Sequence, residues 1–197
     1  MIAALTGSGL AAAAGLNAYI PFLLVAVLAR VSDVIELPPD YAWVQSNWAI
    51  GVGAVLLFTE LVLDKIPVID HLNDGVATLI RPTVGGLIFS ATSSAENLDN
   101  SQWMQDNPWL GAILGALFAG LTHGTKAVLR PAVNVSTAGT GAPVISTIED
   151  FASVGLSLAA IFAPILVIFF LVLLAWAVYR LSRWLIRRRR RRVPAPA

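Results

Sequence analysis

Three basic side chains recur at helical spacing in the second half of the chain. His123, Lys126 and Arg130 stand at positions i, i+3 and i+7, which places them on one face of a helix. Asp74 and Arg81 are seven residues apart and share a helical face in the same way. A stripe two turns long extends about 10 Å along the helix axis. Its charges therefore need anionic partners inside the protein or a hydrated cavity, and such a site could bind a proton, an ion or a polar solute.

Five carboxylates are available as partners for these cations. The set is Asp64, Asp70, Asp74, Glu149 and Asp150. We predict a buried polar cluster in which Lys65, Arg81, Lys126 and Arg130 meet these acids. Four cations against five acids leave one carboxylate in excess, which could hold a proton or a cation. An alternative places the charges in headgroups at helix ends, and Glu149 and Asp150 are then first-turn acids that open the last helix.

The composition shows why so many charged groups are unusual here. Of the 197 residues 57% are hydrophobic and only 13% are charged, about half the charged share of a soluble domain. Uncharged runs cover residues 1–29, 41–59, 107–125 and 151–179, and about 20 apolar residues suffice to cross a bilayer. The chain is expected to be an all-α, polytopic membrane bundle, which excludes a disordered chain, a nucleic-acid module and a disulfide-stapled secreted domain.

About five spans are predicted. They cover residues 5–30, 48–63, 72–92, 108–130 and 148–185, within a transmembrane domain at 1–185 and a basic cytoplasmic tail at 186–197. Pro21 is expected to bend the first span and to free the carbonyl of Asn17, although Asn17 could equally hydrogen-bond a neighbouring helix. Pro164 is expected to bend the last span. Segment 72–92, which contains Arg81, either crosses or forms a re-entrant hairpin.

Further sequence signals bear on packing and on a repeat. Gly111 and Gly115 have the small-xxx-small spacing that permits close contact between helices. Residues 74–84 and 123–133 align without gaps, so that Arg81-Pro82 meets Arg130-Pro131. Paired, broken apolar segments of this kind point to a transporter binding site. The sequence therefore suggests an internal repeat without requiring one.

The run of six arginines from Arg187 to Arg192 indicates topology. Directly after an apolar stretch, it predicts a cytoplasmic C-terminus in the cell inner (plasma) membrane and contact with anionic lipid, not nucleic acid. Five spans then place residues 93–107 on the cytoplasmic side. The Gly- and Ala-rich helix faces suit a homo-oligomer as well as internal packing.

Several short motifs resemble the bacterial membrane family catalogued as domain of unknown function 4126. They are residues 15–21 (GLNAYIP), 64–70 (DKIPVID), 81–82 (RP), 123–127 (HGTKA), 134–136 (NVS) and 149–150 (ED). The resemblance extends over residues 5–174, and residues 137–143 depart from the family pattern. It implies an all-helical integral membrane protein with no established activity. The signature positions that it implies are Asn17, Asp64, Lys65, Asp70, Arg81, His123, Lys126, Asn134, Glu149 and Asp150.

Three functions remain open at this point. The first is a transporter or channel for an ion or small polar solute, with its path along the signature residues together with Asp74 and Arg130. The second is a non-transporting membrane scaffold or assembly factor. The third is an intramembrane enzyme, which we do not expect because the chain lacks an HExxH motif, a serine elbow and any cysteine. No cofactor or metal is expected.

Overall fold

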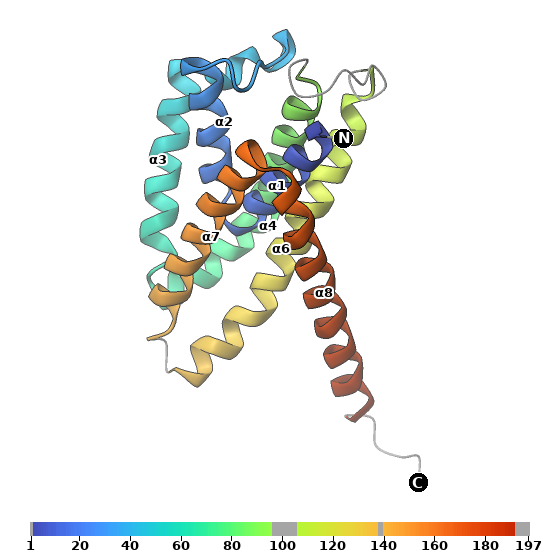
Figure 1. The fold of residues 1–197 in the computed structure, drawn as a ribbon. Coiled ribbons are helices and arrows are strands. Elements are labelled where there is room, and N and C mark those ends of the chain that lie inside the picture. The colour runs from blue at the N-terminus through green and yellow to red at the C-terminus, as the bar shows by residue number, and fades with distance from the viewer. Residues whose placement is uncertain (1, 96–105, 138–139, 192–197) are drawn as a thin grey trace.

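The structure, a computed structural model, is a helical bundle. It describes the chain except residues 1, 96–105, 138–139 and 192–197, and the side chains of 67–72, 74, 132–136, 184–186 and 188–191 also lie outside the description. The helices are α1 (Ile2–Leu16), α2 (Tyr19–Val31), the 3-10 helix η1 (Pro39–Gln45), α3 (Asn47–Leu63), α4 (Pro67–Ser93), α6 (Pro108–Ser136), α7 (Ala142–Phe162) and α8 (Ile165–Arg191). Figure 1 shows their arrangement. The expected all-α class is confirmed.

The first apolar segment is a hairpin and not one tilted span. In the first half of α1, Gly7 lies against Phe89, and near the end of the helix Gly15 lies against Ala119 and Thr122. α2 then runs back to the end where Arg30 donates to the carbonyl of Gln45. Figure 1 shows the outer ends of α1 and α2 on the same side of the bundle. The predicted span over residues 5–30 is therefore wrong, and the chain turns back inside the bundle.

The position of the break also differs from the expectation. The helix is interrupted at Asn17 and Ala18, whereas Pro21 is the third residue of α2. A proline is tolerated in the first turn of a helix because its missing N–H would have no intrahelical partner there. Pro21 therefore fits the start of a new helix and does not bend an old one.

Helices α3, α4 and α6 run along the length of the bundle. α4 is continuous through Pro82, so segment 72–92 does not form a hairpin of its own. α4 and α6 lie side by side, and a Cβ on Gly115 would collide with the carbonyl oxygen of Gly85. Gly111 likewise faces the backbone of Ser90. The predicted close contact through small residues is confirmed.

The predicted last span consists of two helices. α7 ends at Phe162, and α8 starts at Ile165 and runs back along the bundle in the opposite direction (Figure 1). Pro164 lies in the break, where its ring prevents the helix from continuing. Each helix is long and apolar enough to cross a membrane by itself. The expectation of a single bent span over 148–185 is therefore wrong.

The bundle has two ends, which we name by the helix ends that they hold. The N-terminal end holds the start of α1, the end of α4 and the start of α6, where Ser94 and Pro108 line one cavity of about 400 Å³ with residues 36–41. The C-terminal end holds the end of α3, which Lys65 follows by two residues, and the last turn of α8 (Figure 1). The end of α4 and the start of α6 thus lie opposite the end of α8, which corrects the expectation that segment 93–107 and the end of the last span are on one side.

Three or four helical segments of the described chain meet length and hydropathy criteria for membrane spans. They are residues 108–131, 142–162 and 165–183, with the bent pair η1 and α3 as a fourth. α4 is long enough at 27 residues, but its ionisable groups set it apart from these. These apolar helices are those of a multi-pass membrane protein.

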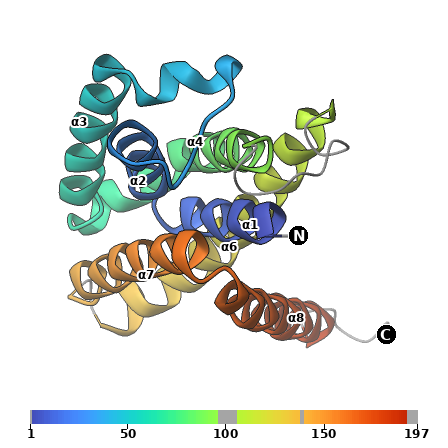
Figure 2. The ribbon, with the colours of Figure 1, turned by 45° about the horizontal axis from the view of Figure 1, so that its top comes forward.

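The core is built around α1. Its residues 6–15 are all buried, and most of them are Gly, Ala, Ser or Thr. Figure 2 shows α1 between α4 and α7. Because these side chains are small, the surrounding helices approach α1 closely: a Cβ on Gly9 would lie 2.7 Å from Ala160 and Val167. The hairpin tip is thereby held in the interior.

Candidate functional site

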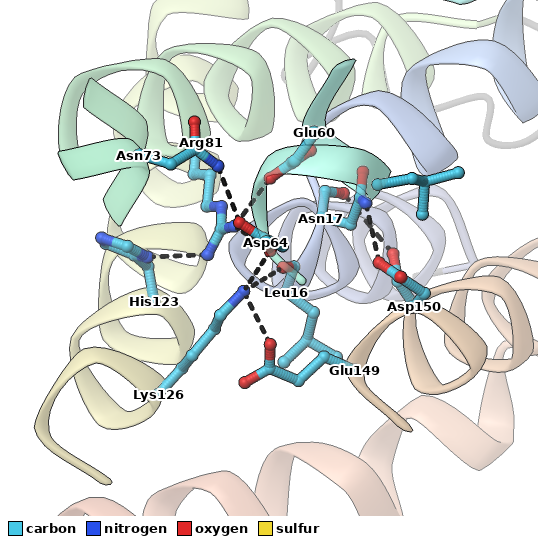
Figure 3. Close-up of polar contacts among 12 residues, drawn as sticks. Leu16, Asn17, Glu60, Asp64, Asn73, Arg81, His123, Lys126, Glu149 and Asp150 are labelled. Atoms are coloured by element: carbon cyan, nitrogen blue, oxygen red, sulfur yellow. Dashed lines mark hydrogen bonds and ion pairs between the residues drawn. The ribbon is translucent and has the colours of Figure 1, made fainter. Parts of the chain in front are cut away.

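A cluster of charged side chains surrounds the hairpin tip (Figure 3). Asp64, which follows the last residue of α3, is only 2% exposed and lies at its centre. Its Oδ2 is 3.0 Å from a guanidinium nitrogen of Arg130, 3.7 Å from Lys126 Nζ and 3.8 Å from a guanidinium nitrogen of Arg81. Its Oδ1 accepts a hydrogen bond of 2.7 Å from Asn73. One carboxylate thus connects cations from α4 and α6.

Arg81 is fully buried and links α4 to three other helices. Its guanidinium donates to Glu60 at 2.6 Å and to the carbonyl of Gly15 at 3.4 Å. It also lies 3.0 Å from His123 Nδ1. Because arginine can only donate, Nδ1 is the acceptor, and the proton of a neutral His123 is on Nε2, 3.1 Å from Thr78 Oγ1.

The predicted stripe on α6 is present and faces inward. His123, Lys126 and Arg130 are all buried. Lys126 donates to the carbonyl of Leu16 at 2.9 Å and pairs with Glu149 at 2.8 Å. Arg130 also pairs with Glu149, at 2.6 Å. α6 and α7 are therefore joined through one carboxylate, as Figure 3 shows for Lys126 and Glu149.

The two helix ends at the hairpin tip each have polar partners. α1 ends with the carbonyls of Gly15 and Leu16, which accept from Arg81 and Lys126, and cations suit the negative end of a helix dipole. α2 begins with the N–H groups of Tyr19 and Ile20, which donate to Asn17 Oδ1 at 3.1 and 3.3 Å. These four backbone groups at the break thus have hydrogen-bond partners, as the interior requires.

Asn17 connects this tip to α7. Its Nδ2 donates to Asp150 at 2.9 Å. Its predicted free carbonyl lies 3.5 Å from Ser153 Oγ, which also donates to the carbonyl of Ala13 at 3.1 Å. The predicted hydrogen bond from Asn17 to a neighbouring helix is confirmed, whereas the expectation that Pro21 frees the Asn17 carbonyl is wrong, because Ser153 donates to this carbonyl.

The cluster reaches the protein surface on one side. Asp150 lies 3.7 Å from Lys65, whose side chain is 41% exposed, while the Asp150 side chain is 16% exposed. Glu149 is 12% exposed, and Asp64 and Lys126 are each 3% exposed in their side chains. Exposure therefore falls stepwise from Lys65 at the C-terminal end of the bundle to the interior.

The charges in the described cluster balance. Four cations, Lys65, Arg81, Lys126 and Arg130, face four acids, Glu60, Asp64, Glu149 and Asp150. The backbones of Asp70, Asp74 and Asn134 lie in α4 and α6, but their side chains are outside the description. The predicted excess of one carboxylate over the cations, which included Asp70 and Asp74, thus stays a prediction. No group of three or more His, Cys, Asp or Glu side chains in the described part of the chain could hold a metal ion.

Glu149 and Asp150 differ from their expected position in the helix. α7 begins at Ala142, so these two acids lie about two turns into the helix and not in its first turn. The effect of the helix dipole falls off within the first turn. Their environment is instead set by Lys126, Arg130, Lys65 and Asn17.

Four contributors were not among the predicted site residues. They are Glu60, Asn73, Thr78 and Ser153. Glu60 had a detectable signal, because it precedes Asp64 by four residues on the same helical face. Asn73, Thr78 and Ser153 had none, since uncharged polar residues are ordinary at helix ends and interfaces.

The comparisons with known proteins agree with the sequence motifs. A family model described as "Domain of unknown function (DUF4126)" matches residues 4–184. Searches of curated proteins and of solved structures find no match. The match includes every residue of the charged cluster and both helices of the hairpin. The chain belongs to this family, the domain of unknown function DUF4126.

Proposed function

We propose that the protein carries an ion or small polar solute across a membrane, through the charged cluster at the hairpin tip. One observation supports this above the others: the α1–α2 hairpin ends inside the bundle, and its tip is surrounded by ionisable side chains. In transporters, interrupted helices place their ends at the substrate site, because each helix end carries the partial charge of the helix dipole. Irregular backbone is tolerated at membrane depth where it lines such a site.

The stepwise exposure of the cluster supports a route from the C-terminal end of the bundle. A solute entering there meets Lys65 and Asp150 first, and then Glu149 and Lys126. Because the described cluster is neutral, an added charge must separate an existing ion pair. The Lys65–Asp150 pair is long at 3.7 Å and partly solvated, so it is the pair that opens at the lowest cost.

The proposal can be tested with purified protein in liposomes. Proton flux and the flux of a panel of inorganic ions are measured for the wild type, Asp64→Asn and Lys126→Ala. We expect flux in the wild type and its loss in both variants. The control is Asp40→Asn, an exposed acid in η1, which should transport normally. Flux that persists unchanged in Asp64→Asn and Lys126→Ala would contradict the mechanism.

A substitution at a less buried residue tests the route with a smaller risk that the protein fails to fold. Asp150→Asn removes the charge that faces Lys65 but keeps an oxygen that can accept from Asn17. We expect it to elute from size-exclusion chromatography as the wild type does, and to transport at least several-fold more slowly. Normal flux in a well-folded Asp150→Asn protein would place the route elsewhere.

A specific observation also favours the scaffold as a second candidate. Every acid of the described cluster has a cation within 4 Å, and saturated networks of this type can specify a fold without moving charge. A scaffold predicts no flux for any ion in the panel from correctly folded wild-type protein. The liposome experiment thus separates the two functions.

A further inference from the structure

A groove runs along the side of α3 that carries Gly53 and Glu60, between α2 and α4. Two cavities of about 190 Å³ each adjoin there and share Tyr19 and Leu56 as lining residues. The hairpin contributes to the groove, because α2 begins at Tyr19 inside the bundle and Tyr19 lines both cavities together with residues of α3 and α4. The groove is therefore a direct result of the fold.

The half of the groove nearer the N-terminal end is apolar and aromatic. Phe22, Val52 and Leu87 line it together with Trp43 and Trp48. The two tryptophan rings are stacked, with centroids 5.9 Å apart, and such residues are typical of a membrane interface. This half can accept a hydrocarbon chain from the bilayer.

The other half mixes polar with apolar side chains and contains a buried acceptor. Glu60, Asn73 and Arg81 line it with Tyr19 and Thr59. Glu60 is 5% exposed; its Oε1 accepts from Arg81, while its Oε2 has no hydrogen-bond partner among the described residues. A buried oxygen left without a donor costs about 1–3 kcal/mol. A ligand that donates one hydrogen bond would remove this cost.

We propose that the groove binds a neutral, hydroxyl-bearing amphiphile with a single long apolar chain. Its hydroxyl donates to Glu60 Oε2, and its chain extends past Leu56 towards Trp48. The twelve residues from Trp48 to Glu60 correspond to about 18 Å along the helix axis, which suits a long alkyl or isoprenoid chain. A charged head is disfavoured because Glu60 is already neutralised by Arg81, so an added charge would be uncompensated.

The test uses photoreactive lipids and the full chain in liposomes. Hexadecanol carrying a chain diazirine is compared with the corresponding hexadecane and hexadecanoic acid, and the crosslinked peptides are mapped by mass spectrometry. We expect the alcohol to label peptides containing Tyr19, Leu56 and Leu87 several-fold more than either analogue does. Equal labelling by the alcohol and the alkane would show only lipid exposure and would overturn the proposal.

A pair of neighbouring substitutions provides the control. Leu56→Trp fills the shared part of the groove, whereas Val55→Trp adds the same ring one residue away, at a position that is 66% exposed and does not line either cavity. Labelling by the alcohol should fall about tenfold in Leu56→Trp and remain in Val55→Trp. Equal labelling of the two variants would also contradict the proposal. The result does not depend on whether the protein transports an ion.

Discussion

At the scale of single residues, the position of Asp64 explains how three basic side chains are tolerated in an apolar bundle. Arg81, Lys126 and Arg130 come from two helices, and each approaches the same carboxylate oxygen within 4 Å. Removing one partner of a buried pair is costly because the other charge remains without solvent. Asp64 therefore contributes strongly to the free energy of unfolding, because three buried cations share its carboxylate.

We expect Asp64→Asn to lower the free energy of unfolding by about 3 kcal/mol, the range for a broken buried ion pair. Chemical unfolding in mixed micelles measures this change. The double variant Asp64→Asn/Arg130→Gln also removes one of the opposing cations, so it should be less destabilised than the sum of the two single variants. Strict additivity would show that the Asp64–Arg130 contact of 3.0 Å does not contribute.

At the scale of elements, the hairpin tip depends on Asn17. Its side chain caps the first N–H groups of α2 and donates to Asp150 on α7. Asn17→Ala should cost roughly 1–3 kcal/mol, since a lost cap is worth about 1 kcal/mol and Asp150 also loses a donor. Thermal unfolding in detergent checks this value. Asn47→Ala, at an exposed position at the start of α3, serves as control, and equal melting temperatures would contradict the role of Asn17.

The contact between α4 and α6 allows a comparison of two glycines on one helix. A Cβ at Gly115 would collide with the carbonyl oxygen of Gly85, whereas a Cβ at Gly124 would meet nothing within 4 Å. Gly115→Ala should destabilise the protein by about 1–3 kcal/mol through overpacking. Gly124→Ala should be neutral or slightly stabilising, because alanine favours helix. Reversed effects in thermal unfolding would show that the helices are not packed in this way.

The sequence predicts those elements whose apolar pattern is interrupted by polar residues. The span at 48–63 follows from Trp48 and Asp64 at its two sides, and α3 has nearly the same bounds. The inward stripe of His123, Lys126 and Arg130 follows from helical spacing alone. The break at Asn17 does not, since the flanking residues are as apolar as those of a continuous helix; it depends on tertiary partners such as Arg81 and Asp150. The break at Ala163 is marked by Pro164, from which we expected a bend and not a reversal of direction.

For the candidate site, charge is a stronger signal than polarity. Asp64, Arg81, Lys126, Arg130, Glu149 and Asp150 could be predicted because an ionised group in an apolar chain requires a partner. Asn73 and Ser153 donate to Asp64 and to the carbonyl of Ala13, and the sequence alone does not place these acceptors next to them. The pairing scheme itself also depends on the fold, because Glu149 and Asp150 lie on one helix but face different cations.

At the scale of the whole molecule, the two ends of the bundle differ in charge. The N-terminal end carries Asp33, Glu36 and Asp40 with the single base Arg30 in residues 30–45, whereas the C-terminal end carries Lys65, and Arg180 and Arg183 lie towards it on α8. By the positive-inside rule, the C-terminal end is expected to be cytoplasmic. The hairpin tip would then be reached from the cytoplasm past Lys65.

The absence of cysteine from the sequence makes this orientation simple to test. Asp40→Cys and Lys65→Cys each introduce one thiol, at opposite ends of the bundle and at exposed positions. A membrane-impermeant maleimide should label Asp40→Cys in intact cells and Lys65→Cys only after lysis. The reverse pattern would invert the proposed orientation, and labelling of both in intact cells would contradict a bundle that separates the two ends.

The central position of α1 has a consequence for biosynthesis. α1 leaves the ribosome before the helices that surround it, and Gly9 packs against Ala160 and Val167, about 150 residues later in the chain. Its small side chains offer little hydrophobic surface of their own, and its burial is complete only after α7 and α8 have been inserted. A ribosome that stalls before α7 therefore leaves behind a polypeptide whose innermost helix is covered by α4 and α6 but is exposed on the side that faces α7 and α8.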